Sequence, residues 1–249
     1  INVYIAMDFP RDDKDLTNWN SVKKILENSF PTAKFDIPNK NLGCRVRICS
    51  AVSWVLSQED RVIVLEDDCL PGNSFFDYCD LTLEKFSSSE EIGMISGCNI
   101  LEPDKLKSLP DFYLSKFAGI WGWATWRRAW PQEVLSPDRT FSLDLLNEQE
   151  SSYWNYFLSL IKNKKLDTWD YLWDAYRFEK RLLTLVANEN FIKNIGFDIG
   201  ATHSNIDDAK RYSKAIGLFK QDSLETNRVY RSKKYEEIYY KELIYRDAI

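Results

Sequence analysis

The sequence predicts an α/β protein in which a mixed, mostly parallel sheet is covered by helices on both faces. Short β-branched runs alternate with longer stretches whose apolar residues recur at helical spacing, which is typical of successive strand-helix units. The run from Val62 to Leu65 is apolar at every position, as expected of a strand buried on both faces. A chain of 249 residues, 44% of them hydrophobic, is long enough for one large domain or two small ones.

The first half of the chain alternates between predicted strands and helices. Val3, Ile5 and Met7 share one face of an opening strand that ends at Asp8. After it we expect, in order, a helix over 15–30, a strand over 33–37, a helix over 43–56, the apolar strand, a helix over 75–86 and a strand over 92–96. This succession predicts a mostly parallel, doubly wound sheet.

The second half adds a strand over 112–117, which we expect to run antiparallel, and a helix over 137–165. Asp167 or Thr168 can cap the next helix, and a strand follows over 182–187. The charged, tyrosine-rich remainder suits one terminal helix. We therefore expect one domain over 1–204 and a helical tail over 205–249 that packs on it.

Charge and composition exclude several classes of function. The formal charge of −5, from 33 basic and 38 acidic residues, gives no overall attraction to nucleic acid or to anionic membranes. His203 is the one histidine, so a multi-histidine zinc centre within this chain is excluded. The five cysteines form no C-x-x-C pair, which favours a reducing cytosol, and no apolar run approaches the ~20 residues of a membrane span. The basic segment 228–246 suits either peripheral docking on the inner face of a membrane or a solvated helix face.

Three consecutive acids, Glu66, Asp67 and Asp68, follow the apolar run and precede a Pro-Gly turn. They should lie at the carboxyl end of the strand, where open α/β sheets bind their ligands. Adjacent anions repel one another, so a hard cation such as Mg²⁺ or Mn²⁺ is expected there. The alternative is an acidic, solvated turn.

Two further stretches are equally consistent with ligand binding and with a purely structural role. Arg45 lies near the start of the helix over 43–56, where it could contact a diphosphate bound at the helix end or only solvent. The window from Gly119 to Trp126 combines glycines with tryptophans. Such a window suits stacking on a sugar, and equally suits a loop packed over the core.

Asp170 and Asp174 are one helical turn apart and share a face of the predicted helix. Taken alone, Asp170 is a first-turn acid that the helix dipole stabilises. His203 lies in a glycine-rich loop, where a lone histidine is more often structural than a ligand.

In this order the motifs resemble those of the GT-A glycosyltransferases, nucleotide-sugar-dependent enzymes built on a Rossmann-like sheet. The likeness is to bacterial family-2-like or hemolysin-related transferases, and in plan to the N-acetylglucosaminyltransferase I type enzymes. It covers about residues 1–204 and is specific at the Glu-Asp-Asp motif and the glycine-tryptophan loop. GT-A domains begin with a strand and a helix ahead of the strand that here ends at Asp8, and we expect this first unit to be missing.

The resemblance assigns roles to the matching residues. Asp68 would bind Mn²⁺ or Mg²⁺ with His203 as a further ligand, and Asp170 would be the catalytic base with Asp174 as the second candidate. The remaining candidates would contact the nucleotide (Asp8, Arg11, Arg45, Glu66 and Asp67) or the sugars (Gly119, Trp121, Gly122, Trp123 and Trp169).

The function implied by the resemblance is metal-dependent transfer of a sugar from a nucleoside-diphosphate donor, such as a UDP-sugar, to an acceptor hydroxyl. The acceptor would be a glycan or glycolipid, the anomeric configuration would invert, and the setting would be surface polysaccharide or glycoconjugate synthesis. The alternatives are a non-catalytic carbohydrate-binding domain derived from a transferase and, with less support, a glycoside hydrolase, which also pairs carboxylates with aromatic platforms.

Overall fold

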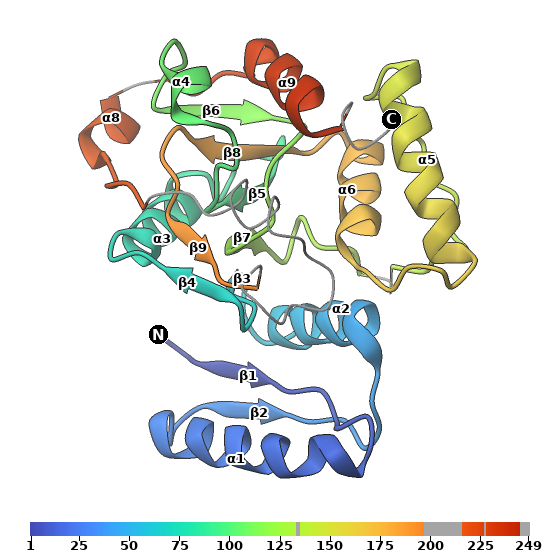
Figure 1. Cartoon of the computed structure of the whole chain (residues 1–249). Coiled ribbons are helices and arrows are strands. Elements are labelled where there is room, and N and C mark those ends of the chain that lie inside the picture. The colour runs from blue at the N-terminus through green and yellow to red at the C-terminus, as the bar shows by residue number, and fades with distance from the viewer. Residues whose placement is uncertain (133–134, 197–215, 227, 245–249) are drawn as a thin grey trace.

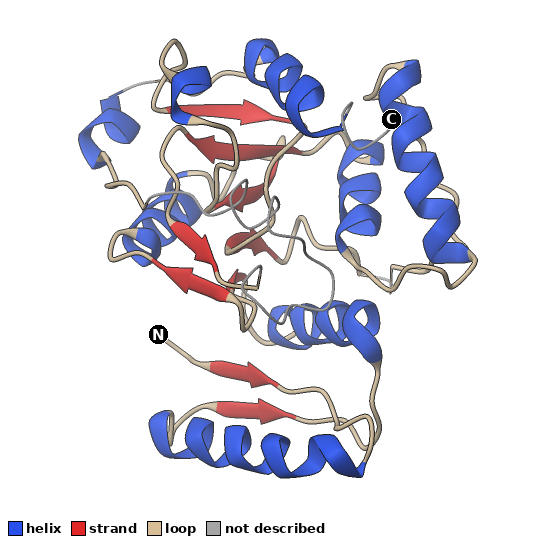
Figure 2. Cartoon of the chain, in the orientation of Figure 1, coloured by secondary structure: helices blue, strands red, loops and turns tan. Residues whose placement is uncertain are grey.

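The computed structural model of the protein describes residues 1–132, 135–196, 216–226 and 228–244. Strands and helices alternate along most of the chain, which confirms the α/β class (Figure 1). The described residues form one sheet of five strands and two sheets of two strands each (Figure 2). No helix within these ranges is both long and apolar enough to span a membrane.

The five-stranded central sheet is mixed. Its strands, in spatial order, are β3 (Arg61–Val64), β7 (Trp123–Trp126), β5 (Ile92–Ser96), β8 (Leu183–Ala187) and β6 (Phe112–Ser115). Of the neighbouring pairs, β5 and β8 are parallel, whereas β7 is antiparallel to both of its neighbours and β6 is antiparallel to β8. The antiparallel direction of β6 is confirmed. The expected mostly parallel pairing is corrected, because β7 enters between β3 and β5 and replaces one parallel contact with two antiparallel ones.

Helices cover both faces of the central sheet. They include α2 (Gly43–Leu56), α3 (Phe75–Lys85), α5 (Glu148–Lys162), α6 (Asp170–Glu179) and α9 (Lys233–Tyr239). Side chains alternate along a strand, so each strand contributes residues to the hydrophobic clusters on both faces of the sheet. Met94 and Trp123 join the cluster that contains residues of α2, α6 and α9, whereas Ile95 and Ala124 join the cluster that contains residues of α3.

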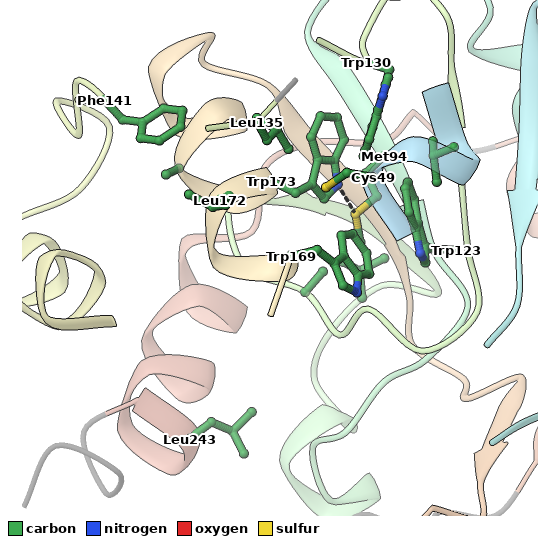
Figure 3. Packing of buried hydrophobic residues seen from close by; sticks show 14 of the residues in the cluster. Cys49, Met94, Trp123, Trp130, Leu135, Phe141, Trp169, Leu172, Trp173 and Leu243 are labelled. Carbon is green, nitrogen blue, oxygen red and sulfur yellow. Dashed lines mark hydrogen bonds between the residues drawn. The ribbon is translucent and has the colours of Figure 1, made fainter. Parts of the chain in front are cut away.

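Tryptophans dominate the core beneath α6 (Figure 3). The rings of Trp123 and Trp169 stack with centres 5.2 Å apart, and those of Trp130 and Trp173 lie 4.8 Å apart. The indole N–H of Trp173 points at Met94 Sδ, 3.3 Å away. This packing holds the first turn of α6, and with it Asp170, against β7.

A smaller amino-terminal unit consists of β1 (Tyr4–Ala6), α1 (Asp13–Ser29) and β2 (Lys34–Asp36). β1 and β2 are parallel, and among the described strands neither is hydrogen-bonded to the central sheet. Asp12 caps α1, which starts two residues earlier than expected, by accepting from two backbone N–H groups. Because α2 packs against both β1 and β3, it joins this unit to the central sheet (Figure 1).

The carboxyl-terminal segment returns to the central sheet through α8 (Gln221–Thr226), α9 and a π-helical turn, η1 (Tyr240–Ile244). The backbone of Leu114 in β6 donates to the carbonyl of Tyr230 and accepts from the N–H of Ser232. Tyr235 is fully buried. The described part of this segment forms α8, α9 and η1, where one terminal helix was expected, and α9 packs against β6.

Some elements differ from the sequence prediction. The helix expected over 137–165 is shorter, because Asn147 and Glu150 form a capping box that starts α5 at Glu148. A short helix, α4 (Pro103–Leu106), replaces part of an expected loop. A small antiparallel ladder between β4 (Cys69–Pro71) and β9 (Ile192–Asn194) was not predicted, and it brings the acidic motif beside residue 194.

Candidate functional site

The acidic motif follows the end of β3, as predicted, and its three carboxylates have different surroundings. Glu66 and Asp68 are partly buried, whereas Asp67 is exposed. Burial raises the pKa of Glu66 to about 7, and repulsion from Asp68, Asp170 and Asp67 adds to the effect. The repulsion from Asp170 shows that α6 and the acidic motif share one electrostatic field.

Asp68 faces the end of β9. Its Oδ2 accepts a hydrogen bond of 3.1 Å from Asn194 Nδ2, and its carbonyl accepts one of 2.8 Å from the N–H of Ile195. The backbone of Gly196 comes so close that a Cβ there would lie 2.5 Å from Asp68 Oδ2. Gly196 therefore permits an approach that a larger residue would block.

A metal at this point would find few protein ligands in the described residues. They contain no group of three or more histidine, cysteine or acidic side chains arranged to hold a metal ion. His203, the expected second ligand, lies outside the described residues. Asp68 and Glu66 could still share a Mg²⁺ or Mn²⁺ that kept its waters and bound a diphosphate, since such ions are commonly held by one or two carboxylates.

Asp8 lies at the start of α2. Its carboxylate accepts 2.9 Å hydrogen bonds from the backbone N–H groups of Leu42 and Gly43, so it caps the helix. Gly43 has φ of +75°, a left-handed conformation that favours glycine. These two N–H groups are already satisfied, which leaves a bound diphosphate only the following turn of α2.

The two arginines expected near the nucleotide are each paired with an acid. Arg11, exposed and just ahead of α1, has its Nε 2.8 Å from Oδ2 of Asp15 in the first turn of that helix. Arg45 Nε lies 3.7 Å from Asp167 Oδ1, at the approach to α6. The pairing of Arg45 places the start of α2 next to the start of α6, and both helices border the acidic motif.

α6 positions Asp170 in its first turn and Asp174 one turn later, as the sequence predicts. Asp170 accepts a hydrogen bond from Thr168 Oγ1, and burial raises its pKa. Asp174 forms an ion pair with the completely buried guanidinium of Arg177. Burial raises the pKa of Asp174 to about 6, although Arg177 acts in the opposite direction.

Asp170 and Asp174 line a cavity of about 220 Å³ between α5, α6, η1 and the loop that leads into β7. Gly119 and Trp121 contribute to the same wall, as expected of the glycine-tryptophan loop. Tyr239, from the carboxyl-terminal segment, lies on another wall. The arrangement therefore brings a partly buried carboxylate, Asp170, to a cavity of a size that suits one sugar ring.

Gly122 and Trp123 of the glycine-tryptophan loop, and Trp169 at the start of α6, are structural. Trp123 and Trp169 are each 1% exposed and stack on each other in the core, which replaces the expectation that they contact a sugar (Figure 3). Gly122 has φ of +59° and packs against Ile192, at the turn into β7. The alternative of a loop packed over the core holds for Gly122 and Trp123.

Sequence reasoning missed several residues in or directly behind the wall of the cavity. Arg177 is three residues after Asp174, so helical spacing alone could have predicted the pair. Tyr153 and Tyr239 reach the cavity from α5 and α9, and no local pattern marks them.

Comparison with known proteins adds no identification: no protein-family model matches the chain, and no curated protein matches it by sequence. The functional proposal therefore depends on the geometry of the site.

Proposed function

We propose that this chain is a metal-dependent, inverting glycosyltransferase that uses a nucleoside-diphosphate sugar, with Asp170 as the general base. The observation that carries the proposal is the position of Asp170. It is a half-buried carboxylate with a raised pKa on the wall of the 220 Å³ cavity, within electrostatic reach of Glu66 in the acidic motif. Acceptor and donor would thus meet between α6 and the end of β3.

Asp170 suits the role of base better than Asp174. A raised pKa makes a carboxylate a stronger proton acceptor, and the hydrogen bond from Thr168 Oγ1 holds it in place. Asp174 is neutralised by Arg177, whose guanidinium also donates to Thr184 Oγ1 over 2.8 Å. A carboxylate committed to a buried cation is a poorer base, so Asp174 acts by orienting the helix turn.

The donor side would be formed by Glu66, Asp68 and the first turns of α2. A Mn²⁺ or Mg²⁺ held by Asp68 would neutralise charge on the departing diphosphate. Glu66, with a pKa of about 7, can donate a hydrogen bond to a donor hydroxyl when it is protonated. The partly buried setting of both carboxylates excludes some water from the place where the diphosphate would lie.

Nucleotide binding and donor cleavage test this proposal separately. We expect UDP with Mn²⁺ to raise the melting temperature of the wild-type protein, because a ligand that binds the native state stabilises it. Asp68→Ala should lose the shift, whereas the neighbouring exposed variant Asp67→Ala should retain most of it. An Asp68→Ala protein with the wild-type shift would remove Asp68 from the donor site.

Release of UDP from a panel of UDP-sugars tests the base. Asp170→Asn should retain the Mn²⁺-dependent shift and lose turnover by about 100-fold or more. A wild-type rate in Asp170→Asn would eliminate Asp170 as the base. If no nucleoside diphosphate bound the wild-type protein with either metal, the non-catalytic carbohydrate-binding alternative would replace the transferase.

A further inference from the structure

The cavity beside α6 carries one sign of charge. Among the described residues that line it, Asp170 and Asp174 are the charged ones. Arg177, the cation that pairs with Asp174, is 0% exposed and is not part of the lining. Its Nη1 is also bound to Thr184, so the guanidinium cannot turn toward a ligand. Within the described part of the chain, a ligand in the cavity would therefore meet carboxylates and no accessible cation.

The rest of the wall is aromatic or aliphatic. Trp121, Tyr153 and Tyr239 lie along it, together with Leu243 and Ile244 from η1. Aromatic faces combined with carboxylates suit the apolar face and the hydroxyl groups of a sugar ring, and they attract cations through the ring quadrupole. This composition indicates a polar ligand with an apolar face.

A second, independent observation points to a ligand. Trp154 also lines the cavity and is 3% exposed, yet its indole N–H has no hydrogen-bond partner among the described residues. A buried donor without an acceptor is unfavourable, and an oxygen atom of a bound molecule would satisfy it. The wall of the cavity thus contains one unsatisfied donor, the carboxylate of Asp170, and the carboxylate of Asp174, which is paired with Arg177.

We propose that this cavity binds a sugar ring whose charge is zero or positive, that it prefers an amino sugar, and that it rejects acidic sugars. The assignment of this sugar as the acceptor rests on the proposed transferase function. The binding preference itself follows from charge. An ammonium group would compensate carboxylates that burial leaves poorly solvated, whereas a third carboxylate would add repulsion in a site with little water.

Three monosaccharides that share the same ring but differ in charge (positive, neutral and negative) test the preference. Glucosamine, glucose and glucuronate can be titrated into the full chain at pH 7 and followed by ligand-observed NMR. We expect glucosamine to bind most tightly and glucuronate to bind at least about tenfold more weakly than glucosamine, with glucose between them. Equal affinities, tightest binding of glucuronate, or no binding of any of the three would overturn the proposal.

Two variants separate charge from shape. Asp170→Asn should bring the affinities for glucosamine and glucuronate closer together, whereas the exposed control Asp104→Asn, outside the cavity, should leave their ratio unchanged. Trp154→Phe retains an aromatic ring and removes the N–H, so it should weaken the binding of all three sugars by a similar factor. A ratio unaffected by Asp170→Asn in a folded protein would count against the proposal, and the wild-type series decides the matter if that variant does not fold.

Failure of the sugar preference can be distinguished from failure of the transferase proposal. If the sugar order failed while UDP release still depended on Asp170, only the charge preference would be lost. If nucleotide binding failed while the sugar order held, the cavity would remain a sugar site in a protein that is not a transferase.

Discussion

The amino-terminal unit and the central sheet are built from the same alternation of strands and helices, yet they differ sharply in burial. Every residue of β5 and β8 is buried. By contrast, none of the α1 residues is buried by the described part of the chain, and Ile25 is 62% exposed. The difference teaches that a helical or strand pattern predicts the element, whereas burial depends on how many neighbours the element acquires.

β3 lies on the border between these two regions. Its apolar run was expected to be covered on both faces, but Val62, Ile63 and Val64 are only partly buried, because among described strands β3 pairs with β7 alone. The acidic motif continues from this edge strand. The proposed donor side therefore depends on the loosely packed half of the molecule, and the cavity on the well-packed half.

The largest expected effect is on the core beneath α6. Trp173→Ala should lower the free energy of unfolding by about 3–5 kcal/mol, because the indole is completely buried and its removal leaves a large cavity. Leu26→Ala, on the partly buried face of α1, should lower it by under about 2 kcal/mol. Urea titration of both variants measures the difference, and equal losses would contradict the comparison.

The next effect concerns local opening. We expect backbone amides of α1 and β1 to exchange with deuterium about 100-fold faster than those of β5 and β8, because few buried contacts oppose the opening of the amino-terminal unit. Hydrogen exchange followed by mass spectrometry would show this directly. Uniform protection across both regions would mean that the unit unfolds only together with the central sheet.

Local sequence rules predicted what local chemistry determines. The first-turn position of Asp170 and its shared face with Asp174 follow from helical spacing, and both are present. The rest depends on contacts between distant segments. β7 inserts between β3 and β5, and this burial turns Trp123 from an expected sugar platform into core. No local pattern marks such an insertion.

A smaller expected effect is on the pH dependence of stability, and it tests the acidic motif that follows β3. Burial raises the pKa of Glu66 from 4.5 to about 7, so between these values the folded state holds more protons than the unfolded state. Stability should therefore fall as pH rises from about 4.5 to about 7, and Glu66→Gln should remove about 1 kcal/mol of that fall after allowance for partial exposure. Urea titrations across this range, with chelator present, would measure it.

The exposed neighbour supplies the control for that titration. Asp67→Asn should leave most of the pH dependence in place, since Asp67 is exposed and exerts the smallest of the repulsions that raise the pKa of Glu66. An unchanged slope in Glu66→Gln would show that Glu66 is as well solvated as Asp67, and the acidic motif would then be an ordinary surface turn.

The smallest effect compares two helix caps of similar chemistry in the two regions. Asp12 caps α1 and Asn147 caps α5, each by accepting hydrogen bonds from backbone N–H groups. Replacing either by alanine should destabilise its helix by about 1 kcal/mol. If the amino-terminal unit opens on its own, Asn147→Ala should lower the global free energy of unfolding, whereas Asp12→Ala should mainly speed amide exchange within α1. A global loss in Asp12→Ala as large as that in Asn147→Ala would show that α1 shares the cooperativity of the central sheet, and that its exposed residues do not make it a separate unit.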